Sequence, residues 1–182
     1  MVGAGHRTGG CDREGDTVVL VDELDAELGT VGRHRAHLVP GQLHRAVSVC
    51  LLDVDGRALL QQRAASKPHF AGRWSNACCT HPRPGEAPAD AAVRRVREEL
   101  GLRIVELDHC GFFVYRALDV ESGLVEHELD HVFTGVTAER PQPAPAEVMD
   151  WAYVEVDAGD LARFDGPAYT PWLRPVLERA LW

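Results

Sequence analysis

The alternation of apolar and polar positions predicts a chain built mainly from β-strands, with two helices. Strands are expected at residues 17–21, 46–52, 58–62, 111–115, 124–136 and 150–156. Residues 22–31 mix acidic and small side chains without a clear period, which favours a turn followed by a second short strand. The Asp55-Gly56 pair is typical of a tight turn, so the strands at 46–52 and 58–62 are expected to form a hairpin.

The clearest helical pattern follows residue 87. Pro88 suits a first-turn position and Gly101 a C-terminal stop. Between them lies one apolar stripe, formed by Ala92, Val93, Val96 and Leu100. A closing helix is expected over 173–181, with Pro175 in its first turn. The Pro-rich residues 141–145 are expected to form a surface connection.

The size of the chain favours one domain. Its 182 residues suffice for one full core, and a hydrophobic share of 45% with 26% charged residues is ordinary for a globular protein. The first sixteen residues hold five glycines and no periodicity, so 1–16 is expected to be a mobile extension and 17–182 the single domain.

Charge and hydropathy exclude several classes of partner. A formal net charge of -9 opposes contact with nucleic acid or anionic lipid over most of the surface. No apolar run approaches the ~20 residues of a membrane span, and no signal-peptide pattern opens the chain. These features predict a soluble, cytoplasmic protein.

The cysteines are expected to be reduced, because their number, five, is odd and two of them are adjacent. Cys78 and Cys79 lie with His81 in residues 62–85, which lack a clean period and are expected to form a long functional loop. A basic loop of this kind could activate a thiol. Structural zinc ligation or packing of small side chains remain alternatives.

Three carboxylates share one face of the expected strand at 124–136, because a period of two aligns Glu126, Glu128 and Asp130. Carboxylates so close together repel one another, and a divalent metal would neutralise and orient them. A solvated acidic edge strand is the alternative. His37, His44 and His81 could complete a metal site, although each of them alone is more often a surface or core residue.

Ion-pair spacing marks one edge of the helix at 88–100. Arg95 and Glu99, and likewise Arg94 and Glu98, lie four residues apart, as in ordinary surface pairs. The functional alternative is an arginine that grips phosphate next to a carboxylate that holds Mg²⁺. Further cations stand in segments that could converge on this edge, namely Arg33, Arg63 and Lys67.

The same helix carries a family resemblance. Residues 86–102 resemble the Nudix box G-x5-E-x7-R-E-U-x-E-E-x-G-U, with Thr80 in place of the glycine and Arg95 in place of a glutamate. Over residues 18–172 the chain also resembles the type I isopentenyl diphosphate isomerases. The matching segments are 43–46, 62–67, 74–82, 115–117, 126–130, 147–150 and 170–172.

This resemblance implies an α/β (α+β) Nudix-like fold, with a mixed β-sheet core, flanking helices and additional N-terminal strands. It implies roles for residues as well. Cys79 and Glu128 match the catalytic pair, with Tyr115 beside Glu128. The divalent metal ligands correspond to His37, His44, His81, Glu126 and Glu128, and the diphosphate-linked Mg²⁺ to Glu99. The diphosphate contacts correspond to Arg33, Arg63, Lys67 and Arg95, and Trp172 matches an indole that faces the hydrocarbon.

The implied activity interconverts isopentenyl and dimethylallyl diphosphate for isoprenoid biosynthesis, with a small allylic or homoallylic diphosphate as substrate and a monomer or weak homodimer as the working form. The metal at the His/Glu site is left open among Mn²⁺, Zn²⁺ and Mg²⁺. One alternative is a Nudix diphosphohydrolase that uses Glu86, Glu98 and Glu99 on a nucleoside diphosphate derivative, and Arg95 opposes it. Another is a non-catalytic module with a structural metal.

Overall fold

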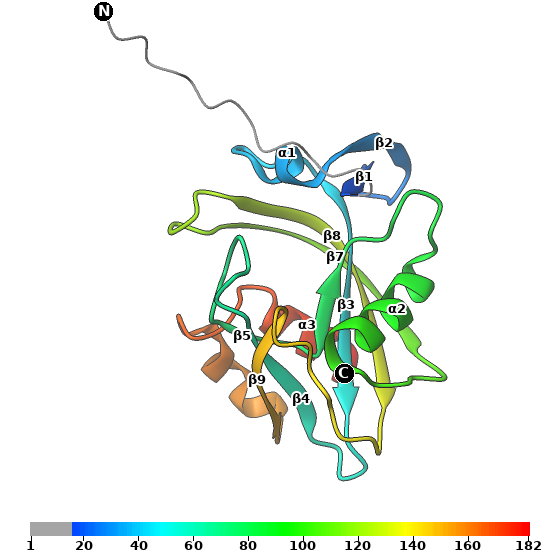
Figure 1. The fold of residues 1–182 in the computed structure, drawn as a ribbon, viewed down its shortest axis with the longest axis vertical. Coiled ribbons are helices and arrows are strands. Elements are labelled where there is room, and N and C mark those ends of the chain that lie inside the picture. The colour runs from blue at the N-terminus through cyan, green and yellow to red at the C-terminus, as the bar shows by residue number, and fades with distance from the viewer. Residues whose placement is uncertain (1–15) are drawn as a thin grey trace, which may run out of the picture.

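Nine strands form one mixed sheet in the computed structural model, which describes residues 16–182 (Figure 1). The strands are β1 (Thr17–Val21), β2 (Glu27–Gly32), β3 (His44–Leu52), β4 (Ala58–Arg63), β5 (Trp74–Ser75), β6 (Cys78–Thr80), β7 (Asp108–Leu118), β8 (Val125–Val136) and β9 (Val148–Val154). The helices are α1 (Arg33–His37), α2 (Pro88–Leu100), α3 (Leu173–Leu181) and the 3-10 helix η1 (Ala158–Asp165). The expected mobile extension lies, except for Asp16, outside the described residues. The Asp16 carboxylate pairs with Arg33 Nε at 2.9 Å.

Strand β3 is the centre of the sheet. It runs parallel to β8 from the pair His44 and Glu128 to the pair Leu52 and Val136. It is antiparallel to β6, and its register with β4 is limited to the pair Leu52 and Ala58. The expected hairpin is therefore confirmed at its turn but wrong along its length, since β4 pairs with β9 and β5 instead. A turn signal specifies a reversal of the chain, whereas the partners of a buried strand depend on packing.

The two faces of the sheet are covered by different helices. Val47, Val49 and Leu51 of β3 pack with Val96 and Leu100 of α2. The opposite face packs on α3 and η1, through a cluster that includes Cys50, Leu60, Val132, Trp172 and Leu177. Burial on both faces explains why β3 reads as a nearly continuous apolar run.

Helix α2 begins and ends where its sequence predicts. Pro88 occupies its first turn, and Gly101 adopts the left-handed conformation with φ 67°. The buried face of the helix differs from the predicted apolar stripe. Val93, a member of that stripe, is exposed, and Glu99, outside it, is buried. The buried face therefore includes a carboxylate. The Pro-rich segment is also not wholly on the surface, since Pro141 is buried and the neighbouring Gln142 N–H donates to the carbonyl of Leu100.

The segment expected to be a long loop, 62–85, contains the short strands β5 and β6. Strand β6 pairs with β3 through Ser48 and Cys79, so the Cys79 backbone is part of the sheet. The short helix α1 and the 3-10 helix η1 were not predicted, because five and eight residues give too little periodicity. None of the helices in the described part of the chain is long and apolar enough to cross a bilayer.

Candidate active site

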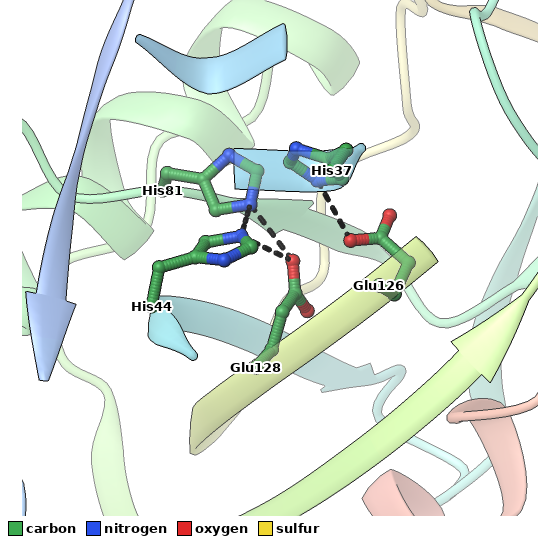
Figure 2. Close-up of side chains that lie close together, drawn as sticks. All are labelled: His37, His44, His81, Glu126 and Glu128. Carbon is green, nitrogen blue, oxygen red and sulfur yellow. Dashed lines mark hydrogen bonds and ion pairs between the residues drawn. The ribbon is translucent and has the colours of Figure 1, made fainter. Parts of the chain in front are cut away.

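Three histidines and two glutamates converge at the start of β8 (Figure 2). They come from separate elements: His37 from α1, His44 from β3, His81 after β6, and Glu126 and Glu128 from β8. One ligand atom from each lies within 4.8 Å of all the others. Because β8 lies between β3 and β7, the alternative of a solvated acidic edge strand is wrong.

The hydrogen bonds of two rings show which nitrogens face the centre. His37 Nδ1 lies 2.7 Å from the carbonyl oxygen of Arg33, and His44 Nδ1 lies 2.8 Å from that of Gln42. A carbonyl oxygen only accepts, so each Nδ1 carries a hydrogen, and the Nε2 of a neutral ring turns a lone pair inward.

These inward nitrogens meet carboxylate oxygens. His37 Nε2 is 2.9 Å from Glu126, and His81 Nε2 is 2.8 Å from Glu128 and 3.1 Å from His44 Nε2 (Figure 2). Lone pairs and anionic oxygens at such distances repel unless a proton or a cation lies between them. Imidazole nitrogens oriented by backbone carbonyls, together with carboxylates, form the donor set of a divalent metal site, so the five residues fit such an ion.

Burial and neighbouring charges act on the pKa values of this cluster in opposite directions. Burial lowers the pKa of His37, but the hydrogen bond and charge of Glu126 outweigh it and raise that pKa to about 9. For His81 burial prevails over its bond to Glu128 and lowers the pKa to about 4. Burial raises the pKa of Glu126, yet its hydrogen bonds to His37 and His69 hold it well below the usual range. The rings around Glu126 therefore favour its anionic form.

His69 belongs to the cluster and was missed from the sequence. Its Nε2 lies 2.5 Å from Glu126 Oε1, and its ring stacks on His37 with 5.1 Å between centroids. Its Nδ1 is buried without a hydrogen-bond partner among residues 16–182. The residues around His69 form no recognisable pattern, so no local signal distinguishes it from the other histidines of the chain.

Cys79 lies beside the indole N–H of Trp172. The Trp172 Nε1–H donates to Cys79 Sγ at 3.1 Å, and the thiol donates to Asn76 Oδ1 at 3.2 Å. Burial and then the charge of Asp130 raise the pKa of Cys79 to about 12, so it is a thiol at neutral pH. Cys78, in contrast, is fully buried in the core, where it packs as a small apolar residue.

Glu128 is held by a tyrosine as well as by the histidines. Tyr115 lies opposite Glu128 in the β7–β8 register, and its hydroxyl donates to Glu128 Oε2 at 2.5 Å. Burial, followed by the charge of Glu128, holds the pKa of Tyr115 well above its ordinary value. Tyr115 therefore remains a hydrogen donor aimed at the carboxylate.

One cavity of about 450 Å³ connects these groups with the expected diphosphate contacts. It is lined by the acid–base candidates Cys79, Tyr115 and Glu128, by Trp172, and by Arg33, Arg63, Lys67 and Arg95. Thus the structure brings together the cations that the sequence leaves in separate segments. Glu99, beneath them, lies 2.5 Å from Arg95 and 3.3 Å from Lys67, and accepts from Gln61 at 2.8 Å.

The other two box carboxylates pair with Arg94. Glu86 accepts from Arg94 at 2.7 and 2.9 Å and from the N–H of Arg83 at 2.8 Å. Glu98 pairs with Arg94 at 3.2 Å. Because Arg95 stands where the Nudix box has a further glutamate, this helix offers one carboxylate fewer to gather metals.

Comparisons with known proteins identify the family of the chain. The NUDIX domain family model matches residues 42–174. The isopentenyl-diphosphate Delta-isomerase of Streptomyces griseus is 46% identical over 97% of this chain and 89% of its own length. That of Nocardia farcinica is 49% identical over 90% of this chain and 93% of its own.

Solved structures support the same fold. The crystal structure of DR0079 from Deinococcus radiodurans superposes with a TM-score of 0.73 at 20% identity, over 91% of this chain and 99% of that one. The MutT protein of Methanosarcina mazei gives a TM-score of 0.61 at 19% identity, over 75% of this chain and 91% of that one. The Nudix-like α+β fold expected from the sequence is therefore confirmed, and the chain belongs to the Nudix family and, within it, to the isopentenyl-diphosphate Delta-isomerases.

Proposed function

We propose that this protein interconverts isopentenyl and dimethylallyl diphosphate by moving one double bond. The observation that carries the proposal is the shared cavity, where a thiol and a tyrosine-bonded carboxylate adjoin a cluster of cations. Relatives that carry the name of this isomerase match the chain over most of its length.

Binding is expected to begin at the cations. Guanidinium and ammonium groups bind phosphate oxygens through charge-assisted hydrogen bonds, and those that line the cavity include Arg33, Arg63, Lys67 and Arg95. Mg²⁺ held by Glu99 would neutralise part of the diphosphate charge. Energy from this remote contact can be used to orient the five-carbon chain at the proton-transfer groups.

The reaction adds a proton to the terminal CH₂ carbon of isopentenyl diphosphate and removes one from C2, so that the charge passes through a tertiary carbocation at C3. Cys79 and the Glu128–Tyr115 pair are the groups proposed to exchange these protons. Cys79, which is a thiol at neutral pH, and Glu128, which accepts a hydrogen bond from Tyr115, are each able to exchange one proton with a substrate carbon. The two steps balance, since one proton is gained and one is lost.

The carbocation needs a dry, electron-rich surrounding. Trp172 is 2% exposed, and its ring lies 5.8 Å from that of Tyr115 and 5.2 Å from that of Phe70. An aromatic face stabilises a desolvated cation by ~2 kcal/mol or more. Trp172 therefore serves both as a wall against water and as a partner for positive charge.

A divalent ion at His37, His44, His81, Glu126 and Glu128 would supply fixed positive charge that polarises the Glu128 carboxyl. The donor set leaves Mn²⁺, Zn²⁺ and Mg²⁺ as candidates. We propose further that the protein works in the cytoplasm as a monomer or weak homodimer and that its partners are small diphosphates rather than nucleic acid or membrane. The net charge of -9 supports the last point.

The test is incubation of the protein with isopentenyl diphosphate and Mg²⁺ in D₂O, followed by proton and phosphorus NMR. The expected product is dimethylallyl diphosphate that carries deuterium and an intact diphosphate. Cys79→Ala and Glu128→Gln are expected to abolish turnover with the fold retained, whereas Cys110→Ala, outside this cavity, should remain active. Full activity of either site variant would refute the assignment, and release of phosphate would favour the hydrolase.

A further inference from the structure

A carboxylate already occupies two of the proposed diphosphate contacts. Glu147, which precedes β9, lines the cavity. Its Oε2 accepts from Arg95 NH2 at 2.7 Å and also pairs with the ammonium of Lys67. These are the two cations that Glu99 contacts from beneath.

We propose that the Glu147 carboxylate occupies the place of the diphosphate when no substrate is bound. Glu147 then holds Lys67 and Arg95, and it must release them when a diphosphate binds. The inference rests on the proposed function, since it takes these cations as the diphosphate contacts. Glu147 touches the cations rather than the reacting carbons, so it is a positioning residue that sets the affinity and release of the ligand.

The two carboxylates differ in how they are anchored. Glu99 is 1% exposed and is fixed by Gln61 as well as by the cations. The Glu147 side chain is 31% exposed, and its Oε2 atom pairs with both Lys67 and Arg95. When an anion binds those cations, the Glu147 side chain can rotate toward water, whereas the buried Glu99 side chain cannot reach water. Glu147 is therefore the carboxylate that yields.

The charge balance around Lys67 and Arg95 determines how the replacement of Glu147 by a diphosphate affects binding. Lys67 and Arg95 carry two positive charges, and Glu99 with Glu147 carries two negative ones, so the group is neutral before the ligand arrives. Burial raises the pKa of Glu147, but its bonds to Lys67 and Arg95 bring it below the ordinary value, so it is ionised at neutral pH. A diphosphate must compete with a bound anion, which weakens its binding and helps the product to leave.

Arg63 provides a contact that is open to the incoming anion. Its Nε donates to the carbonyl of Phe70 at 3.1 Å and its NH2 to that of His69 at 3.0 Å. Carbonyl oxygens hold the guanidinium in place without cancelling its charge. Arg63 can thus attract the diphosphate before Glu147 gives way.

The test measures the affinity of the holoprotein for inorganic pyrophosphate in Mg²⁺ buffer by titration calorimetry. Glu147→Gln and Glu147→Ala are expected to bind about tenfold more tightly than the unmodified chain, the scale of one competing charge-assisted contact. Glu98→Gln is the matched control, since it removes an equal charge that lies 3.3 Å from Arg95. Its effect on affinity is expected to stay under about twofold, because an exposed pair contributes little.

Unchanged or weaker pyrophosphate binding in both Glu147 variants would overturn the inference, and so would an equal gain in Glu98→Gln. In turnover of isopentenyl diphosphate, Glu147→Gln is expected to lower KM by a similar factor without raising kcat, whereas loss of a merely structural carboxylate would raise KM. The pyrophosphate titration does not depend on isomerisation. A protein that binds pyrophosphate as expected but forms no dimethylallyl diphosphate would refute the proposed function alone.

Discussion

Supplying a divalent cation is expected to raise the thermal stability of this protein, and removing it to lower that stability. The cause is the cluster of His37, His44, His81, Glu126 and Glu128, whose ligand atoms lie within 4.8 Å of one another. In the unfolded chain these residues are separated by as many as 91 positions, from 37 to 128. The ion therefore binds the folded state far better than the unfolded one, and its binding energy becomes folding energy.

The size of the effect follows from mass action. An ion present at 100 times its Kd stabilises the folded state by about 2.7 kcal/mol. For a domain of 150–250 residues, each kcal/mol raises Tm by about 2–4 °C. The expected difference between the chelated protein and the protein with saturating metal is therefore about 5–11 °C. The effect should be larger for the ion that the site binds more tightly.

The assay is a thermal melt followed by the fluorescence of the four tryptophans. The protein is first stripped with a chelator, and Zn²⁺, Mn²⁺ and Mg²⁺ are then added separately. Glu126→Gln removes one buried ligand charge while it keeps the side-chain shape, so this variant should lose most of the shift. Glu121→Gln, in the exposed turn before the same strand, is the matched control and should keep it.

Two results would refute this reasoning. One is a Tm of the unmodified chain that is equal in chelator and in millimolar amounts of each of the three ions. The other is a shift in Glu126→Gln as large as that of the unmodified chain, because the stabilising ion would then bind elsewhere.

Two further predictions concern residues that flank the two ends of helix α2. Glu86→Gln removes the negative charge and one of the two oxygens that accept from Arg94, at 2.7 and 2.9 Å, and should destabilise the fold by about 1–3 kcal/mol at pH 7 in urea unfolding. Those bonds, and the N–H of Arg83, lower the pKa of Glu86 below its ordinary 4.5, so the contribution is complete above that pH and is lost as the pH falls through the folded pKa. An equal gap between variant and parent at pH 7 and pH 3 would contradict this. Gly101→Ala should cost about 1–2 kcal/mol for the left-handed conformation and more for the Gln142 carbonyl oxygen 3.0 Å from the new Cβ, whereas Gly56→Ala, with nothing within 4 Å, should cost only the former. Equal losses in the two glycine variants would show that the close approach has no effect.

Local pattern in the sequence was sufficient for most of the elements. The strand at Thr17–Val21, the helix over Pro88–Leu100 and the closing helix lie where periodicity, Pro88 and Gly101 predict them. The period of two along β8 placed Glu126, Glu128 and Asp130 on one face, and all three are buried there. These features depend on neighbours within a few residues, so the amino-acid order alone specifies them.

Local pattern failed where partners come from distant parts of the chain. The hairpin of β3 and β4 is open beyond its turn because β6 pairs with β3 instead, at Val47, Ser48 and Val49. The other edge of β3 pairs with β8, some 84 positions further on, from His44 opposite Glu128. Residues 62–85 were expected to be a loop because β5 and β6, of two and three residues, are too short to show a period. His69 and Glu147 were not assigned as site residues, since no local period or spacing indicates the groups they meet, although Glu147 lies in the matching segment 147–150.

What the amino-acid sequence determined by itself is most of the longer elements and the chemical types available: carboxylates on one strand face, histidines able to join them, two adjacent cysteines and scattered cations. Only the tertiary structure decided which of them share a cavity and which are neutralised. The parallel register of β3 and β8 brings His44 to Glu128, and the turn before β9 brings Glu147 onto Lys67 and Arg95. Such meetings follow from burial and strand pairing over long separations, whose energies no local period encodes.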